Sequence, residues 1–370
     1  MTLEELRRQL DGLDRQLLEL VAARQTTARE IVRVKSSTGR ATRDYARERE
    51  VIVGARDRAV ALGVSPDVAE SMMRLLIRTS LTTQEQARVA AQGAGNGRRV
   101  LVIGGAGKMG NWFAQFMASQ GFEVQIADPG VTAAAGPDAL RDWRQSDLSH
   151  DFIVVAAPLG ITNTVLHELA ERKPKGIVFD LGSLKSPLRS GLEALRAAGV
   201  RVASIHPMFG PDTELLSGRH VIHIDLGSAE TLEAVKGLFA ATMAEPVTMN
   251  IDEHDRVIAF VLGLSHALNI AFFTALADSG EAAPRLVQLS STTFDAQFDI
   301  ASKVAEESPE LYFEIQRLND FGKDSLDALG RAVEQVRSAV AAGDQQRFKA
   351  LMLQGLEYTK GRRVMTQRRA

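Results

Sequence analysis

The sequence predicts a multidomain protein: an all-α domain of three helices, an α/β domain with a doubly wound parallel sheet, and an all-α C-terminal domain. Leucines recur every three or four residues from Leu3 to Leu20, which is the pattern of an amphipathic helix. Short apolar runs alternate with helical stretches between residues 99 and 250, which favours a parallel sheet. Beyond Asn250 only helical periodicity remains, to about Lys360.

Length and composition agree with this organisation. A chain of 370 residues is too long for one typical core, so we expect domains at 1–91, 99–250 and 251–370, with a Gly-rich linker at 92–98. The net charge of −2 gives no argument for a nucleic-acid or membrane partner. Because cysteine is absent and the N-terminus is charged rather than signal-like, we expect a cytoplasmic protein.

The first domain is expected to contain three long helices. The leucine seam continues to about Lys35 and must pack on other helices. A second helix is expected over about residues 43–62. The third should follow Ser65 and Pro66, over about residues 67–91, because proline is favoured in the first turn of a helix.

A glycine-rich turn links the first apolar strand of the sheet, residues 100–103, to an amphipathic helix over about residues 111–119. Its G-x-G-x-x-G spacing in this context predicts a Rossmann NAD-binding domain. The first glycine, Gly105, would allow the tight turn, the second the approach of a pyrophosphate, and the third close packing of helix and strand. Asp128, at the end of the next strand, would bond a ribose hydroxyl and repel a 2′-phosphate, which favours NAD over NADP. The expected cofactor-binding residues are Gly105, Gly107, Lys108, Met109, Gly110 and Asp128.

Two later strand ends carry candidate catalytic groups. Ser183 follows the apolar run 177–181, and His206 follows the run 202–205 before a loop rich in Pro and Gly. Because ligands bind at the carboxyl ends of parallel strands, both side chains can face the nicotinamide. No spacing of His, Asp or Glu predicts a metal site, and we expect His220 and His223 to be packing or surface residues.

The apolar segment from Val257 to Ala277 is about long enough to span a bilayer. It carries Ser265, His266 and Asn269 in its middle and lies between charged segments. We therefore expect a buried helix in an intersubunit core and no membrane span.

Polar residues of the first domain share helix faces at regular spacing. Arg24 and Lys35 lie three helical turns apart, and Ser80 and Gln84 lie one turn apart. Arg7 lies about 25 Å from Arg24 along the helix, so both could serve one small ligand only if Arg7 came from another subunit. The second helix contributes Asp44, Arg47 and Glu48.

Together these residues resemble the all-helical chorismate mutase domain, whose intertwined dimers build each site from both chains. The resemblance implies that Arg7 of the partner subunit, Arg24 and Arg47 hold the two carboxylates of chorismate. It also implies that Glu48 takes the hydroxyl, that Lys35 and Gln84 donate to the ether oxygen, and that Asp44 and Ser80 belong to the site. Rearrangement to prephenate is unimolecular, so fixed cations suffice to fold the substrate and stabilise charge. A pure dimerisation bundle is the competing interpretation.

Residues 98 to 360 resemble prephenate dehydrogenase, through Asp-Leu-Gly-Ser183-Leu-Lys and His206-Pro-Met-Phe-Gly-Pro-Asp. The pair of domains resembles the bifunctional chorismate mutase–prephenate dehydrogenases of tyrosine synthesis. The resemblance implies that neutral His206, assisted by Ser183, takes the hydroxyl proton of prephenate while hydride leaves for NAD and CO2 is lost, giving 4-hydroxyphenylpyruvate. It also implies a homodimer and feedback by tyrosine, and places His254 and His266 at the substrate cleft, against the alternative of a helix start and a core histidine.

One departure from the family concerns a substrate carboxylate. The family holds it with an arginine, and here that position, six residues before Pro309, is Lys303. A lysine keeps the positive charge but cannot form the two parallel hydrogen bonds that a guanidinium group makes to a carboxylate. Prephenate binding should therefore weaken unless Arg256 or Arg285 substitutes. The sequence leaves open a mutase whose dehydrogenase half is impaired or uses arogenate, and a nucleotide-sensing regulatory module.

Overall fold

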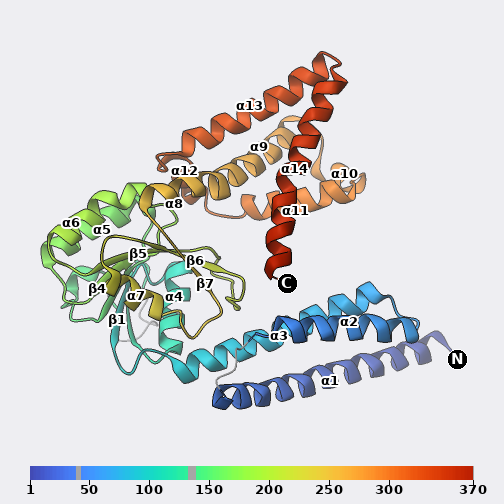
Figure 1. Ribbon diagram of the computed structural model, residues 1–370, viewed down its shortest axis with the longest axis horizontal. Coiled ribbons are helices and arrows are strands. Elements are labelled where there is room, and N and C mark those ends of the chain that lie inside the picture. The colour runs from blue at the N-terminus through green and yellow to red at the C-terminus, as the bar shows by residue number, and fades with distance from the viewer. Residues whose placement is uncertain (39–42, 132–138, 370) are drawn as a thin grey trace. The chain divides into compact units, whose positions relative to one another are not determined.

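The computed structural model describes residues 1–38, 43–131 and 139–369 (Figure 1). The chain forms two compact units. Unit 1 comprises Met1–Val154, Pro207–His223 and Ser228–Val247, and unit 2 comprises Val155–His206, Ile224–Gly227 and Thr248–Ala370. Each unit combines segments that are separated in the sequence, so the expected domain boundaries at 91, 98 and 250 stay predictions.

Three long helices form the N-terminal part of unit 1: α1 (Leu3–Thr38), α2 (Tyr45–Ala61) and α3 (Pro66–Gln92). They run side by side, and α3 packs against both of the others (Figure 1). The carboxylate of Asp44 caps α2 by accepting from the Arg47 amide, and Pro66 occupies the first turn of α3. The predicted three-helix organisation is therefore confirmed.

A seven-stranded sheet has the strand order β2-β1-β3-β4-β5-β6-β7. Residues Arg99–Ile103 pair in parallel with Glu123–Ala127, and β4 pairs in parallel with β5. The chain reverses direction of winding beside β1, which is the position where doubly wound sheets bind ligands. The strands are β1 (Arg99–Ile103), β2 (Glu123–Ala127), β3 (Phe152–Val155), β4 (Ile177–Asp180), β5 (Val202–Pro207), β6 (His220–Ile224) and β7 (Glu245–Met249).

Helices connect the strands, as the alternating pattern predicts. They are α4 (Lys108–Ser119), α5 (Leu159–Arg172), α6 (Arg189–Ala197) and α7 (Ala229–Gly237), with short 3-10 turns at Trp143–Gln145 and Ser186–Leu188. The helix α4 begins three residues before the expected Asn111, because Gly107 is already its N-cap. The pair α7 and β7 was not predicted: β7 is polar, half-exposed and contains Pro246, so it lacks the apolar run of the other strands.

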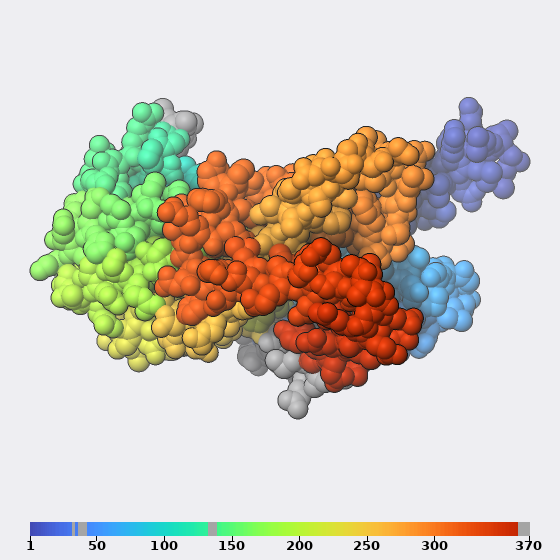
Figure 2. Space-filling model, turned by 90° about the horizontal axis from the view of Figure 1, so that it is seen from above, coloured from blue at the N-terminus to red at the C-terminus, as the bar shows by residue number. Residues whose placement is uncertain are grey.

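Only helices follow β7 in the described part of the chain, as predicted. They are α8 (Ile251–Ile258), a π-helical segment (Ala259–Leu264), α9 (Ser265–Asp278), α10 (Ala283–Gln288), α11 (Thr292–Ala305), α12 (Pro309–Arg317), α13 (Gly322–Ala341) and α14 (Gln345–Arg369). The atoms of α13 and α14, orange and red, lie side by side at the surface in Figure 2. The stretch Ile251–Asp278 is apolar and long enough to cross a membrane by length and composition, although it bears buried polar groups described below.

Candidate functional site

The glycine-rich turn after β1 has a backbone that only glycine can follow. Gly104 has a φ of +85°, so the tight turn that the spacing assigned to Gly105 is made one residue earlier. A Cβ at Gly105 would lie 1.7 Å from Cγ2 of Ile126, and a Cβ at Gly110 would lie 2.1 Å from the Gly104 carbonyl oxygen. Gly105 and Gly110 are therefore required for the close packing of turn, strand and helix.

The polar end of this turn suits a dinucleotide. Asp128 stands at the end of β2, and its carboxylate accepts from the amides of Ala106 at 3.3 Å and Gly130 at 2.7 Å. Gly107 caps α4, and Lys108 and Met109 are its first two residues, so the N-terminus of the helix follows the turn directly. The residues present fit a pyrophosphate at the helix and a ribose at Asp128.

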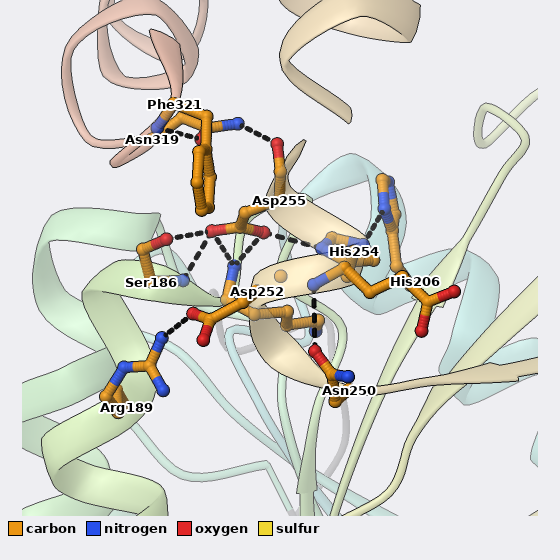
Figure 3. Close-up of polar contacts among 12 residues, drawn as sticks. Ser186, Arg189, His206, Asn250, Asp252, His254, Asp255, Asn319 and Phe321 are labelled. Carbon is orange, nitrogen blue, oxygen red and sulfur yellow. Dashed lines mark hydrogen bonds and ion pairs between the residues drawn. The ribbon is translucent and has the colours of Figure 1, made fainter. Parts of the chain in front are cut away.

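His206, at the end of β5, is buried and faces His254 of α8 (Figure 3). Nδ1 of His206 lies 2.9 Å from Nε2 of His254, and Nδ1 of His254 lies 2.5 Å from Oδ1 of Asp255. The three side chains form one hydrogen-bonded row within unit 2. All three are almost completely shielded from solvent, with His254 and Asp255 at 0% exposure.

The loop after β4 holds Asp255 in place. Its carboxylate accepts from the Lys185 amide at 2.9 Å and from both the amide and the hydroxyl of Ser186. The side chain of Asn319 donates to the Asp255 carbonyl at 2.9 Å and so connects α8 to the segment before α13 (Figure 3). These bonds fix the orientation of the carboxylate that meets His254.

The row fixes the protonation of both imidazoles. Burial would raise the pKa of Asp255, but hydrogen bonds from His254 and Ser186 outweigh it and lower that pKa, so the carboxylate is ionised and only accepts. Burial lowers the pKa of His206 well below its usual value and lowers that of His254, which keeps both rings neutral. His254 then donates through Nδ1 and accepts through Nε2 from the Nδ1–H of His206. The remaining nitrogen, Nε2 of His206, therefore carries a free lone pair.

A buried ion pair lies beside this row. Nζ of Lys185 donates to Asp180 at 2.6 Å and to the Ile205 carbonyl at 2.8 Å, and both charged side chains have 0% exposure. Burial lowers the pKa of Lys185 in spite of the carboxylate partner. The pair connects the ends of β4 and β5 and so sets the position of His206.

Other predicted residues of this half do not join the row. Ser183 is half-buried in the loop between Asp180 and Lys185. The ring of His266 contacts that of Tyr312, with 4.2 Å between centroids and an angle of 38° between the ring planes, and its buried Nδ1 has no hydrogen-bond partner in the described part of the chain. Burial lowers the pKa of His266. Lys303 is exposed in the last turn of α11.

In the N-terminal helices the structure brings Arg24, Ser80 and Gln84 to the contact of α1 with α3. The Arg24 guanidinium donates to the Ser80 hydroxyl at 2.5 Å and to the Leu76 carbonyl at 2.6 Å, and burial lowers its pKa. Oε1 of Gln84 is buried and accepts no hydrogen bond from any described residue. This buried acceptor is therefore open to a donor from outside the described residues.

The α2 residues are engaged locally. Asp44 caps the helix, and Arg47 is exposed and pairs with Glu50 at 2.9 Å. Glu48 is half-buried and receives two hydrogen bonds from Arg43, at 2.8 and 3.0 Å. Of the other predicted residues, Lys35 is half-buried in the last turn of α1, and Arg7 is exposed near its start.

Sequence reasoning missed several residues of both sites. Lys185 ends the motif that contains Ser183, so a charged residue just after a strand end could have indicated it. Asp255 directly follows His254, so a carboxylate next to a candidate histidine could have indicated it. Arg43 and Asn319 gave no signal, because their roles depend on contacts that are distant in sequence or on a bend of the chain. No group of three His, Asp or Glu side chains within the described ranges is placed to hold a metal.

Comparisons with protein families cover both halves of the chain. Residues 6–85 match chorismate mutase type II. Residues 117–247 match the prephenate dehydrogenase nucleotide-binding domain, and residues 250–354 match the prephenate dehydrogenase dimerization domain.

Individual relatives agree with these matches. The chain is 28% identical over 355 residues to a T-protein of Enterobacter agglomerans, which covers 94% of this chain and 90% of the relative. It is 25% identical over 353 residues to a T-protein of Haemophilus influenzae, covering 94% and 89%. The fold is similar to that of a prephenate dehydrogenase from Aquifex aeolicus solved with hydroxyphenyl propionate and NAD+, with a TM-score of 0.56 and 19% identity over 72% of this chain and 99% of that one. A Synechocystis arogenate dehydrogenase has a TM-score of 0.54, at 17% identity and with coverage of 72% and 99%.

Proposed function

This chain belongs to the family of bifunctional chorismate mutase–prephenate dehydrogenases, and we propose that it performs the two reactions with the two groups of residues described above. It converts chorismate to prephenate and oxidises prephenate with NAD to 4-hydroxyphenylpyruvate, in tyrosine biosynthesis. The observation that carries the dehydrogenase assignment is the buried row of His206, His254 and Asp255.

His206 is the proposed base of the dehydrogenase. Its neutral Nε2 accepts the proton of the substrate hydroxyl as hydride leaves the same carbon, and loss of the ring carboxylate as CO2 then gives an aromatic ring. His254 and Asp255 hold His206 in the tautomer that leaves Nε2 free, and they stabilise the positive charge that the proton brings. Ser183 follows β4 in the loop that also holds Asp255 and is proposed to assist His206.

The cofactor is NAD, which supplies a hydride acceptor when it is bound. We propose that the turn from Gly105 to Gly110, with Lys108 and Met109, holds its pyrophosphate and that Asp128 binds its adenosine ribose. The bonds from Ala106 and Gly130 orient the Asp128 carboxylate, which favours NAD over NADP.

The mutase half is proposed to act through fixed donors. Arg24, anchored by Ser80, would hold a carboxylate of chorismate, and the side-chain amide N–H of Gln84 would donate to the ether oxygen together with Lys35. Arg47 and Glu48 are engaged with Glu50 and Arg43, so substrate binding would have to exchange these ion pairs for bonds to chorismate. Asp44 supports the site as the cap of α2.

We propose that the protein is a homodimer. It contains a dimerization domain, and the leucines along α1 are exposed: Leu3, Leu6, Leu10, Leu13, Leu17 and Leu20 are each between 45% and 68% exposed. A seam of this kind indicates a helical partner. A second copy would cover it and would supply Arg7 to the mutase site, as the resemblance implies.

Two further assignments are proposals. The helix Ile251–Asp278 carries His254 and Asp255, and its Asn269 accepts from Gln297 at 2.8 Å, so we assign it to the substrate domain and place the enzyme in the cytoplasm with no membrane or nucleic-acid partner. Tyrosine, the end product of this biosynthesis, is the proposed feedback ligand.

The test is NADH formation by the purified protein with prephenate and NAD, and with chorismate and NAD. Both substrates should give NADH, because prephenate made from chorismate feeds the second reaction. NAD binding without NADH formation would indicate that the enzyme with Lys303 does not use prephenate. Arogenate would then be tested as the substrate.

Two variants separate the halves. Arg24→Ala should lose NADH formation from chorismate and keep it from prephenate. His206→Asn should lose NADH formation from both and keep the disappearance of chorismate. Full dehydrogenase turnover by His206→Asn would contradict the proposed base, whereas NAD binding without turnover of prephenate or arogenate in the parent would support a nucleotide-sensing module.

A further inference from the structure

An open cavity of about 380 Å³ in unit 1 is lined by two segments that belong to different catalytic halves. One wall is formed by α2 and α3 of the mutase helices, and the other by residues 215–219 of the segment between β5 and β6. Arginines dominate the lining: Arg43, Arg74, Arg78 and Arg219 stand against the single carboxylate Glu48. The cavity therefore favours an anion of about the size of a small ring compound.

The dehydrogenase segment is held against α3 by a buried carboxylate. Glu85 is 4% exposed, and its two oxygens accept from the amide of Leu216 at 2.8 Å and from the amide of Met243 at 2.5 Å. Burial raises the pKa of Glu85 although both amides act against it. Arg74, Arg78, Leu81 and Glu85 are spaced by three or four residues, so the cavity and its anchor share one face of α3.

A second contact joins the wall to the mutase residues. Arg43 donates to the hydroxyl of Ser217 at 2.7 Å while its other donors hold both oxygens of Glu48. Glu48, to which the resemblance assigns the hydroxyl of chorismate, thus lines the same cavity as residues 215–219. Glu48 is thus the residue through which the cavity adjoins the proposed mutase site, and residues 215–219 lie on the opposite wall.

Two of the four arginines that line the cavity have an ion-pair partner. Arg43 pairs with Glu48, and Arg74 pairs with Glu70 at 2.6 Å. The guanidinium groups of Arg78 and Arg219 donate no hydrogen bond to the residues that the structure describes, and both residues are exposed. The guanidinium groups of Arg78 and Arg219 lie on opposite walls of the cavity. Together they suit an organic dianion, because a guanidinium group binds a carboxylate with two parallel hydrogen bonds.

We propose that the dehydrogenase segment 215–219 completes the mutase site and that Arg219 binds a carboxylate of the ring dicarboxylate substrate there, opposite Arg78. This inference rests on the proposed mutase function of the helical domain. The mutase half is then incomplete without a residue that the dehydrogenase half supplies.

The test measures mutase kinetics of the full-length Arg219→Ala enzyme with chorismate. We expect the KM for chorismate to rise about tenfold at an unchanged kcat, because a charge-assisted bond to the bound substrate is lost. Arg219→Lys should recover part of the loss. NADH formation from saturating prephenate serves as the readout for folding, and it should stay at the parental rate.

Arg201→Ala is the matched control, because Arg201 is an exposed arginine of the same sheet domain that donates to the Lys175 carbonyl and does not line the cavity. Arg78→Ala, on the other wall, should raise KM as Arg219→Ala does. An unchanged KM in both cavity variants, while Arg24→Ala abolishes mutase turnover, would overturn the inference and leave the mutase function intact. Absence of mutase turnover in the parent enzyme would instead contradict the proposed function itself.

Discussion

His206 and His254 meet with their ring planes inclined by 64° and their facing nitrogens 2.9 Å apart. Two histidines in this arrangement share one proton between the rings, so the ionisation of each depends on the other. The Asp255 carboxylate at the far end decides which nitrogen of the row is left without a proton. The arrangement therefore leaves Nε2 of His206 as the nitrogen that can accept a proton.

Asp255→Asn should lower the dehydrogenase kcat about 100-fold, because the amide no longer selects the productive tautomer of His254. Mutase activity should be unchanged. Asp252→Asn is the matched control, since Asp252 is in the same helix, pairs with Arg189 at the surface and takes no part in the row. Equal effects of the two substitutions on kcat would contradict the assigned role.

The dehydrogenase should keep its activity in mildly acidic solution. Burial, with help from the neighbouring His254 and Lys185, lowers the pKa of His206 well below 6.5, and the neutral ring is the active form. Activity is therefore present above the lowered pKa and is lost only as pH falls through it. A profile of kcat/KM against pH checks this, and an acid limb centred at or above 6.5 would be inconsistent with a buried His206 base.

His223→Leu should make the protein less sensitive to acid. Burial and Lys236 lower the pKa of His223 to about 4, and neither ring nitrogen has a partner among the described residues. Between pH 6.5 and 4 the unfolded chain takes up a proton that the folded chain refuses, which costs about 3 kcal/mol of folding free energy. The Tm of the variant should fall less than that of the parent between pH 7 and pH 5; parallel declines would show that the ring is not buried unpaired.

Lys303→Arg should lower the KM for prephenate several-fold, and Lys303→Ala should raise it about tenfold. The exposed ammonium in the last turn of α11 is free to reach a carboxylate, and the guanidinium would add a second parallel hydrogen bond. Steady-state kinetics with prephenate at saturating NAD make the comparison. If both variants match the parent, another cation such as Arg256 or Arg285 holds that carboxylate.

Features encoded within a few residues could be predicted from the sequence. The glycine turn, Asp128 and His206 were found because each stands at a strand end that its own apolar run marks. The contact of His206 with His254 joins residues 48 positions apart, and the anchoring of Asp255 by Lys185 joins residues 70 positions apart. Such partners depend on tertiary packing, which no local pattern specifies.

The roles of single residues were harder to predict than their places. The resemblance places Arg47 at the substrate, and in the structure Arg47 is exposed and pairs with Glu50. The residue that binds Glu48 is Arg43, which no helical spacing singles out. Helical spacing gives the faces of a helix, but it does not say which face a neighbouring segment will cover. The half-exposed strand β7 escaped prediction for a related reason, because it is formed by pairing at the end of the sheet and not marked by an apolar run of its own.

The π-helical segment Ala259–Leu264 acts like a one-residue insertion in the long helical stretch that carries His254 and His266. In an uninterrupted α-helix, His254 and His266 would be rotated about 120° from each other, and one absorbed residue reduces the angle to about 20°. The wide turn thus aligns the two imidazoles along one side of the helix. Deleting a single residue there, such as Val261, would restore regular winding and turn the His266 half of the helix away from the side that His254 occupies, whereas deletions in solvent-facing loops would be absorbed.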